Sequence, residues 1–291
     1  MHSNPAQYDL IAPATLDAVL EILAAEPGYY TPIAGGTEIM VALGAGRLAQ
    51  KNLLSINHLK ELRFIHTTAD EITIGSGTTF TDIRKHALIA SDFPLLSQAA
   101  SWTGSIANQN RGTLGGNIVN ASPAADSPPA LLAYEAELTL ISTRGSRSIP
   151  YADFHLGYKK TILQPDELLY SITLKRNFSG YISYTRKVGT RNAQAISKIA
   201  LAALALLKDG TIEDIRIGAA SLRDRPSRLT ATERTLQGQP ITPDTIAPLI
   251  AQARAALTSE TQPIDDIRST AKYRSAVAAN LLEEFLLTLK S

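Results

Sequence analysis

Apolar residues recur at helical spacing near both ends of the chain. In the stretch 15–26 (TLDAVLEILAAE), four leucine and valine side chains share one face, and Thr15 or Asp17 stands where a capping side chain is needed. The stretch 270–289 (TAKYRSAVAANLLEEFLLTL) repeats a large apolar residue every four positions. Both patterns predict amphipathic helices, which bury the apolar face and expose the polar one.

Between these ends, helix and strand patterns are mixed. Helices are predicted at 80–91, with Thr79 or Thr81 near the cap, at 97–109, and from Thr37 onward. Short apolar or alternating stretches bounded by glycine or polar residues predict strands at 29–34, 52–58, 71–77, 137–143 and 167–175. The mixture predicts an α+β protein.

A turn signal decides between two interpretations of the stretch 199–207 (IALAALALL). Alanine and leucine favour a helix there, but Asp209-Gly210 follows, and then the alternating stretch TIEDIRI. An Asp-Gly pair between two apolar runs is typical of a two-residue hairpin, because both turn positions need a positive φ. We therefore predict two antiparallel strands joined at Asp209-Gly210.

A change in composition near 177–180 (NFSG) suggests a boundary in the chain. The 291 residues are enough for two or three small domains, each with its own core. We predict three parts, 1–58, 59–177 and 178–291.

Composition and charge exclude several classes of protein. Hydrophobic residues make up 44% of the chain and charged residues 19%, which is typical of a globular protein rather than a disordered one. The net charge of +1 argues against a broad nucleic-acid surface. No apolar run approaches the roughly 18 residues of a membrane helix, and the first residues lack the pattern of a signal peptide. These features predict a cytoplasmic protein without a transmembrane segment.

The chain contains no cysteine, which rules out thiolate zinc sites, iron–sulfur ligation and disulfides within it. Its five histidines are scattered without metal-ligand spacing, and we expect them to lie on the surface or in loops. We predict no metal site in this chain. Redox chemistry here would require a bound organic cofactor.

The motif Gly35-Gly36-Thr37 lies between a predicted strand and a predicted helix. Without side chains at the glycines, the phosphates of a ligand can approach the backbone, and free N–H groups at the helix start would face the anion. The alternative is a plain turn that needs a positive φ. The motif is neither a GxGxxG sequence nor a Walker P-loop.

A second Gly-Gly pair opens the stretch 113–133 (TLGGNIVNASPAADSPPALLA), which we interpret as a polar loop broken by prolines. Thr113 offers a hydroxyl, and Asn117 offers both a donor and an acceptor. Asp126 either accepts hydrogen bonds from ligand hydroxyls or caps the helix predicted after it. Two Gly-Gly pairs favour one extended ligand with two phosphates.

A basic stretch and one aromatic residue complete the candidates. The stretch 184–192 (YTRKVGTRN) gathers Arg186, Lys187 and Arg191, which contact either an anionic cofactor or a partner, or form a solvated turn. Trp102, the one tryptophan, either packs in the core or stacks on a ring. No residues suggest a catalytic acid, base or nucleophile.

Five stretches together resemble the medium, FAD-binding subunits of the molybdenum hydroxylases, such as those of carbon monoxide, xanthine and nicotinate dehydrogenases. They are PIAGGTEIM (32–40), the long stretch 113–133, ELLYSITL (167–174), YTRKVGTRNAQAISKIALA (184–202) and DIRSTAKYR (266–274). They run through almost the whole chain. The string Gly-Gly-Asn, Ser-Pro and Asp within 113–133 is the most specific of them.

The resemblance implies an α+β chain with an FAD-binding fold of the vanillyl-alcohol-oxidase type in two subdomains. A C-terminal α+β domain with a small antiparallel sheet and helices follows. It also implies that two segments cradle the FAD pyrophosphate; they comprise Ile33, Ala34, Gly35, Gly36, Thr37 and Glu38, and Thr113, Gly115, Gly116 and Asn117.

Three further FAD contacts are implied by the same resemblance. Asp126 is expected near the sugar-alcohol chain of the flavin, and Leu169 is expected to line the flavin pocket. A basic residue after Tyr184 contacts the cofactor in the family. Lys187 is favoured for this role over Arg186.

In function, the resemblance implies one subunit of a three-part enzyme. A large subunit would hold the molybdenum cofactor, and a small subunit would hold 2Fe–2S clusters. Electrons would pass from these clusters to FAD in this chain and then to NAD or a quinone-type acceptor. The alternatives are a subunit that has lost FAD and bridges its partners, and a stand-alone flavin reductase of the same fold.

Overall fold

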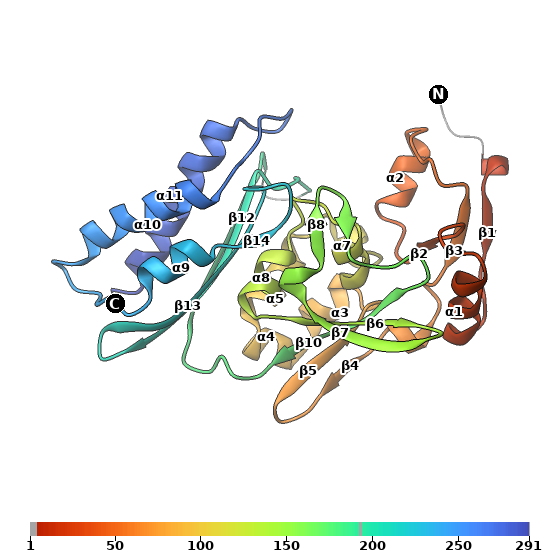
Figure 1. Cartoon of the computed structure of the whole chain (residues 1–291), viewed down its shortest axis with the longest axis horizontal. Coiled ribbons are helices and arrows are strands. Elements are labelled where there is room, and N and C mark those ends of the chain that lie inside the picture. Colours follow the sequence, from red (N-terminus) through yellow and green to blue (C-terminus); the bar gives the residue numbers. More distant parts are fainter. Residues whose placement is uncertain (1–4, 192–193, 291) are drawn as a thin grey trace.

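Three larger β-sheets follow one another along the long axis of the molecule, in the order of the sequence (Figure 1). The computed structural model describes residues 5–191 and 194–290. Besides the helices and strands given below, it contains three short 3₁₀ helices, η1 (Pro5–Gln7), η2 (Lys60–Leu62) and η3 (Tyr151–Asp153). Strands β8 (His155–Gly157) and β9 (Lys160–Thr161) form a separate small hairpin.

The N-terminal part is a three-stranded parallel sheet in the order β1-β3-β2. Its elements are β1 (Asp9–Ile11), α1 (Leu16–Ala25), β2 (Thr31–Ile33), α2 (Ile39–Gly44) and β3 (Asn52–Ser55). The predicted first helix is confirmed, because the Ala18 amide donates to the hydroxyl of the capping residue Thr15 over 3.2 Å. The predicted second helix begins at Ile39 rather than at Thr37.

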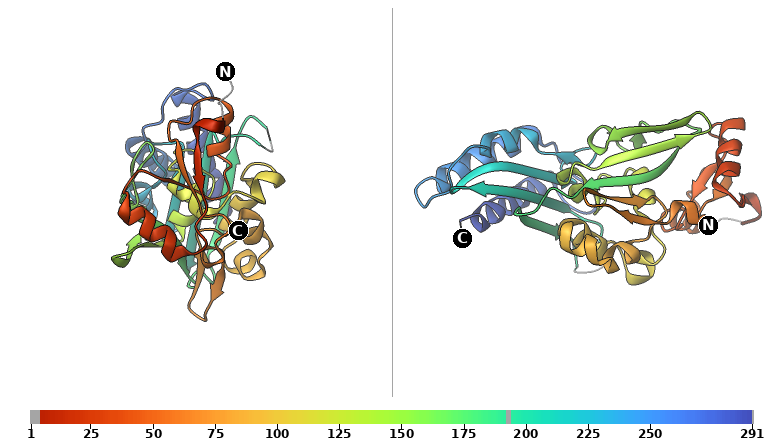
Figure 2. Two further views of the ribbon diagram at one scale, coloured as in Figure 1. Left: turned by 90° about the vertical axis from the view of Figure 1, so that its right-hand side faces the viewer. Right: turned by 90° about the horizontal axis from the view of Figure 1, so that it is seen from below.

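The middle part is a five-stranded antiparallel sheet in the order β4-β5-β10-β6-β7. The strands are β4 (Ile65–Thr67), β5 (Glu71–Gly75), β6 (Glu137–Ser142), β7 (Gly145–Pro150) and β10 (Leu168–Lys175). Figure 2 shows helices gathered on one face of this sheet. They are α3 (Phe80–Lys85), α4 (Ala87–Asp92), α5 (Pro94–Trp102), α6 (Ile106–Gln109), α7 (Leu114–Val119) and α8 (Pro128–Ala133).

The helices predicted at 80–91 and 97–109 are both divided. His86 has an extended backbone (φ −80°, ψ 116°) that ends α3, and its ring nitrogen caps α4. Gly104 has a φ of +62°, which ends the second predicted helix, and Ser105 caps the short helix that follows. Residues 114–119, predicted as part of a loop, form helix α7 because Thr113 caps it and its leucine and isoleucine side chains are buried in the core.

The C-terminal part is a four-stranded antiparallel sheet in the order β11-β12-β13-β14, with helices α10 and α11 on its outer face (Figure 1). The elements are β11 (Ile182–Val188), β12 (Ile199–Lys208), β13 (Thr211–Ala220), β14 (Ser227–Arg228), α9 (Thr230–Leu236), α10 (Ile246–Glu260) and α11 (Ala271–Thr288). The predicted hairpin is confirmed, with φ of 49° at Asp209 and 71° at Gly210.

Strand β12 is buried on both faces, which explains its continuous apolar sequence. Leu201 and Ala203 face the core formed with α10 and α11, whereas Ala202 and Leu204 face the core of the middle part. The sheet therefore belongs to two cores at once and joins the middle part to the C-terminal helices.

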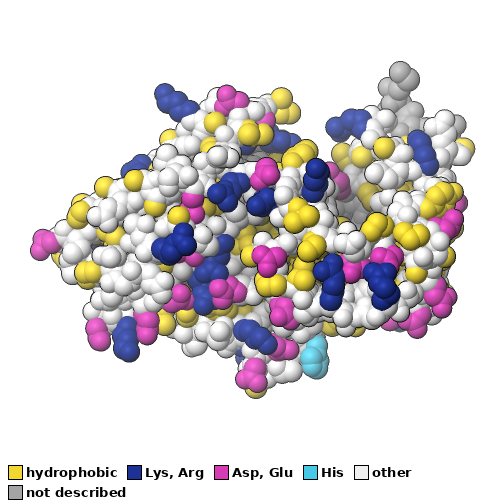
Figure 3. All heavy atoms as spheres, in the orientation of Figure 1, with side chains coloured by type: hydrophobic (Ala, Val, Ile, Leu, Met, Phe, Trp, Pro, Cys, Tyr) yellow, Lys and Arg dark blue, Asp and Glu magenta, His cyan; other side chains and the backbone are white. Residues whose placement is uncertain are grey.

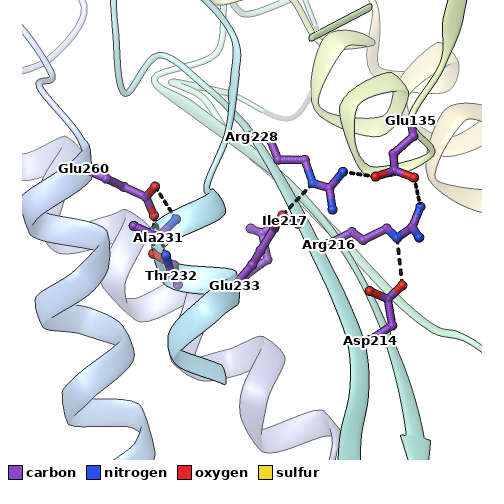
Figure 4. Close-up of polar contacts among 9 residues, drawn as sticks. All are labelled: Glu135, Asp214, Arg216, Ile217, Arg228, Ala231, Thr232, Glu233 and Glu260. Carbon is purple, nitrogen blue, oxygen red and sulfur yellow. Dashed lines mark hydrogen bonds and ion pairs between the residues drawn. The ribbon is translucent and has the colours of Figure 1, made fainter. Parts of the chain in front are cut away.

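Close packing and ion pairs hold the middle part against the C-terminal sheet. A Cβ atom on Gly218 would lie 2.1 Å from the carbonyl oxygen of Pro129, so β13 and α8 meet at backbone contact distance. Beside them, Glu135 pairs with both Arg216 and Arg228 (Figure 4). This junction joins β13 and β14 to α8 and to Glu135 beyond its end.

One histidine differs from the sequence prediction. His155 lies in strand β8 with 6% of its surface exposed, so the expectation that each histidine lies on the surface or in a loop is wrong for this residue. The three predicted parts each contain one of the larger sheets, but their boundaries remain a proposal. Within residues 5–191 and 194–290, no helix is long and apolar enough to cross a membrane.

Candidate functional site

The first Gly-Gly segment lies against the turn that leads into the second one. A Cβ atom built on Gly35 would lie 1.8 Å from the carbonyl oxygen of Arg111, and one on Gly112 would lie 3.4 Å from the Thr37 hydroxyl oxygen. The loop after β2 therefore packs on the turn before α7 at a distance that only glycine permits at position 35. The fold thus joins two segments that lie more than seventy positions apart in the sequence.

The first segment offers free backbone donors. Gly35, Gly36, Thr37 and Glu38 follow Ile33, the last residue of β2, and Ala34, and lead into α2. Across the part of the chain that the structure describes, nothing accepts a hydrogen bond from the N–H groups of residues 35–38. Gly36 has a φ of +74°, and successive N–H groups around such a residue form a concavity that binds anions.

The second segment uses its backbone donors internally. The amides of Leu114 and Gly115 donate to the carbonyl oxygens of Thr78 (3.0 Å) and Ser76 (2.9 Å). The Gly116 amide donates to the hydroxyl of Thr113, the cap of α7, over 3.0 Å. A ligand at this segment would therefore meet the surface at Gly116 and the side chain after it, rather than a set of free amides.

The glycines of the two pairs differ in their surroundings. A Cβ atom on Gly115 would lie 2.5 Å from the side chain of Ser76, so Gly115, like Gly35, serves close packing. Gly116 is exposed, and a Cβ atom there would meet only the Thr113 hydroxyl, at 3.0 Å. In the space-filling view the surface is hollowed where α2 faces the middle part of the molecule (Figure 3).

Asn117 is partly buried beside Gly116. Its side-chain oxygen accepts a hydrogen bond from the Ser127 hydroxyl over 2.6 Å. Within the described ranges no group accepts from its amide nitrogen, which leaves that nitrogen as a donor near the cleft.

Asp126 and Lys187 form a buried pair between the middle part and the C-terminal sheet. Lys187 Nζ lies 2.5 Å from Asp126 Oδ2 and 3.0 Å from the carbonyl oxygen of Trp102. The other carboxylate oxygen accepts from the Ser197 hydroxyl over 2.6 Å. The side chains of the pair are only 11% and 9% exposed. Burial raises the pKa of Asp126, and the ammonium beside it opposes that shift.

This pair bears on two alternatives from the sequence. Asp126 does not cap helix α8, since Ser127 occupies the cap position and forms no side-chain cap bond. Arg186 points to the opposite side of β11, where its guanidinium lies 3.4 Å from Glu284 of α11. Lys187 is therefore the basic residue of this stretch that reaches the loop after α7.

A pocket of about 520 Å³ opens next to the buried pair. Pockets of a few hundred Å³ are large enough for a drug-sized ring system. Its lining comes from α5, from β11 and the loop after it, and from α11, and comprises Trp102, Arg186, Lys187, Val188, Gly189, Thr190, Arg191 and Leu281. The tryptophan is half-buried at the edge of this pocket rather than in a core.

Leu169 lies away from these contacts. It is 5% exposed, pairs with Leu140 in the sheet and belongs to the core of the middle part. Its predicted place beside the flavin remains a prediction.

Sequence reasoning missed two polar residues of this region. Ser197 supports Asp126, and Lys159 reaches the first glycine segment, 3.5 Å from Glu38. Neither stands in a sequence pattern that marks it as part of a site. Both are brought in by the fold alone.

The arrangement fits a dinucleotide with a diphosphate. The four amides at residues 35–38, which have no acceptor in the described part of the chain, provide donors for phosphate oxygens. Gly36 and Gly116 leave the backbone open on both sides of the cleft. The loop after α7 leads from the second glycine segment to Asp126, whose carboxylate pairs with Lys187 in the wall of the pocket. An extended ligand with a ring system at one end matches that shape.

Comparison with known proteins gives two family matches. The FAD binding domain in molybdopterin dehydrogenase matches residues 6–174, and the CO dehydrogenase flavoprotein C-terminal domain matches residues 184–289. Together they span most of the chain.

Individual proteins are similar over four fifths of the chain or more. The chain is 31% identical to the glyceraldehyde dehydrogenase medium chain of Sulfolobus acidocaldarius, over 94% of this chain and 95% of that one. It is 32% identical to the xanthine dehydrogenase FAD-binding subunit of Escherichia coli O157:H7, over 80% of each chain. A solved chain of carbon monoxide dehydrogenase from Hydrogenophaga pseudoflava superposes with a TM-score of 0.91 at 25% identity, covering 98% of this chain and 96% of that one.

Proposed function

The chain belongs to the FAD-binding medium subunits of the molybdenum hydroxylases, and from that premise we propose that it passes electrons from a partner's iron–sulfur clusters through FAD to NAD or a quinone-type acceptor. The observation that carries the proposal is the run of four amides at residues 35–38 that find no hydrogen-bond acceptor among the described residues, with a positive φ at Gly36. Bound FAD supplies the ability to exchange one or two electrons at a time.

The residues of this chain would hold and orient the cofactor. We propose that the segment 33–38 binds the pyrophosphate through its amides. The opposite wall would be Thr113, Gly115, Gly116 and Asn117, with the side-chain amide of Asn117 as a donor.

For the flavin end, we propose that Asp126 and Lys187 lie beside the sugar-alcohol chain and the ring. Each carboxylate oxygen of Asp126 already accepts one hydrogen bond, so a ligand hydroxyl would use a remaining lone pair. The Lys187 ammonium would keep this carboxylate oriented and add positive charge next to the pocket. Leu169 is assigned to the flavin pocket on the family resemblance alone.

The proposed partners rest on the relatives. This chain has no cysteine, so any thiolate-bound iron–sulfur cluster of the assembly would lie on another subunit. We propose a small subunit with 2Fe–2S clusters and a large subunit with the molybdenum cofactor. The relatives support this, because they are named as medium chains or FAD-binding subunits.

The domain arrangement is part of the same proposal. We assign residues 1–58 and 59–177 to two FAD-binding subdomains and 178–291 to the C-terminal flavoprotein domain. The two family models meet between residues 174 and 184, close to the second of these boundaries.

Purification of the native complex, with a tag on this chain, tests the assembly. We expect three polypeptides that co-elute and carry FAD, iron and molybdenum. Elution of this chain alone with FAD bound would favour a stand-alone flavin reductase, and a complex without FAD would favour a bridging role. Reduction of NAD or of a soluble quinone by the complex then identifies the acceptor.

A further inference from the structure

Lys159 stands at the tip of the β8–β9 hairpin, a part of the molecule that none of the proposed FAD contacts includes. Its φ is +54°, a left-handed conformation that is uncommon for a residue with a side chain. The hairpin is held on helix α7, because the buried ring of His155 makes a 2.9 Å hydrogen bond to the carbonyl oxygen of Ile118. The tip is therefore fixed next to the second glycine segment.

The side chain of Lys159 bridges the two glycine segments. Its Nζ donates to the side-chain oxygen of Asn120 over 2.6 Å, and it lies 3.5 Å from a carboxylate oxygen of Glu38. Asn120 follows Gly116 by one helical turn, and Glu38 ends the run of free amides. The ammonium thus lies between the walls of the proposed pyrophosphate cleft, with 37% of the side chain exposed.

The charges around the cleft suggest what the Lys159 ammonium does there. A diphosphate bound at residues 35–38 would lie next to the carboxylate of Glu38, which repels it. An ammonium beside that carboxylate cancels the repulsion, and it can also donate directly to a phosphate oxygen. Both effects favour the bound dinucleotide.

We propose that Lys159 is an additional cofactor-binding residue that contacts the diphosphate of FAD and closes the cleft between the two glycine segments. This inference rests on the proposed FAD site. The contact with Glu38 would then be exchanged, wholly or in part, for contact with a phosphate when FAD binds.

Titration of the full chain, stripped of FAD, with added FAD tests the proposal through the quenching of flavin fluorescence. Lys159→Met keeps the aliphatic stem and removes the charge, and we expect Kd to rise about tenfold, as for the loss of one hydrogen bond between charged groups. Lys160→Met is the matched control, since Lys160 is an exposed lysine on the same hairpin, and its Kd should change less than about twofold. Lys159→Arg should recover much of the affinity.

Two further measurements separate phosphate contact from a purely structural ion pair. If Lys159 contacts phosphate, the Kd for FAD rises more steeply with salt concentration for the unaltered chain than for Lys159→Met. In that case, adding Glu38→Gln to Lys159→Met also does not restore the affinity of the unaltered chain. Equal Kd values for the Lys159→Met and Lys160→Met variants, or wild-type affinity in the Glu38→Gln, Lys159→Met double variant, would overturn the inference. Failure of the unaltered chain to bind FAD would instead overturn the proposed function.

Discussion

A side chain added at Gly36 tests whether the free amides of residues 35–38 bind the FAD diphosphate. Its φ of +74° places a Cβ atom in a conformation that costs a β-branched residue roughly 1–2 kcal/mol. The nearest atom to that Cβ would be Cγ of Met40 at 3.3 Å, the flexible side chain of an exposed residue, so the fold can accommodate it. A domain with a typical 5–15 kcal/mol of stability should survive Gly36→Val.

The effect on FAD should be much larger than the effect on stability. The valine would stand in front of the free amides of residues 35–38, each of which would donate to a charged phosphate oxygen. Loss of two such hydrogen bonds, at about 1.5 kcal/mol each, weakens binding at least a hundredfold, on the order of 3 kcal/mol. We therefore expect Gly36→Val to be purified without FAD.

Gly210→Val provides the matched control. Gly210 has a φ of +71° with no neighbouring atom within 4 Å, and it lies in the hairpin turn of the C-terminal sheet. Thermal unfolding should show a similar loss of stability for both variants, whereas bound FAD, measured by absorbance after denaturation, should be lost only from Gly36→Val. A folded Gly36→Val protein with full FAD occupancy would refute the reasoning.

Three further predictions concern Gly116, Ser197 and Asp266. Gly116→Val should also fold and lose FAD, because the exposed side chain would stand in the cleft; retention of FAD would contradict this. Ser197→Ala removes one hydrogen bond from buried Asp126 and should lower the free energy of unfolding by about 1–3 kcal/mol in urea titrations. Partial burial raises the pKa of Asp266, but hydrogen bonds from Arg274 and from two backbone amides outweigh this and lower the pKa to about 2. Because this pKa is below the usual value of 3.8, the ionised Asp266 carboxylate stabilises the folded state above about pH 4. The free energy of unfolding should therefore fall between about pH 4 and pH 2, and this fall should be absent from Asp266→Asn.

The parts of the fold that the sequence predicted correctly are determined by residues close together in the chain. The hairpin at Asp209-Gly210 rests on the conformation of two turn residues, and the first helix rests on a cap and an apolar face. Each signal lies within a dozen residues. The structure preserves both because the tertiary contacts agree with them.

Helix α7 shows why other parts could not be predicted. Two glycines and a nearby proline favour a loop by propensity alone. The helix forms because Leu114 and Ile118 are fully buried and the amide of Gly115 bonds to Ser76 of another segment. Contacts distant in sequence outweigh the local preference here.

In the candidate site, too, the residues could be identified from the sequence but their contacts could not. The glycine segments, Asp126 and Lys187 were identified by residue type and family resemblance, although 61 positions separate the last two. Their pairing, and the arrival of Lys159 beside Glu38, depend on how the middle part packs against its neighbours. No spacing along the chain encodes those contacts.

The most direct test of FAD binding is the cofactor content of the purified chain. An absorbance spectrum, followed by denaturation and identification of the released flavin, measures it without any assumption about substrate or acceptor. The account predicts close to one FAD per chain. A colourless protein that takes up no added FAD, even with its partner subunits present, would contradict it.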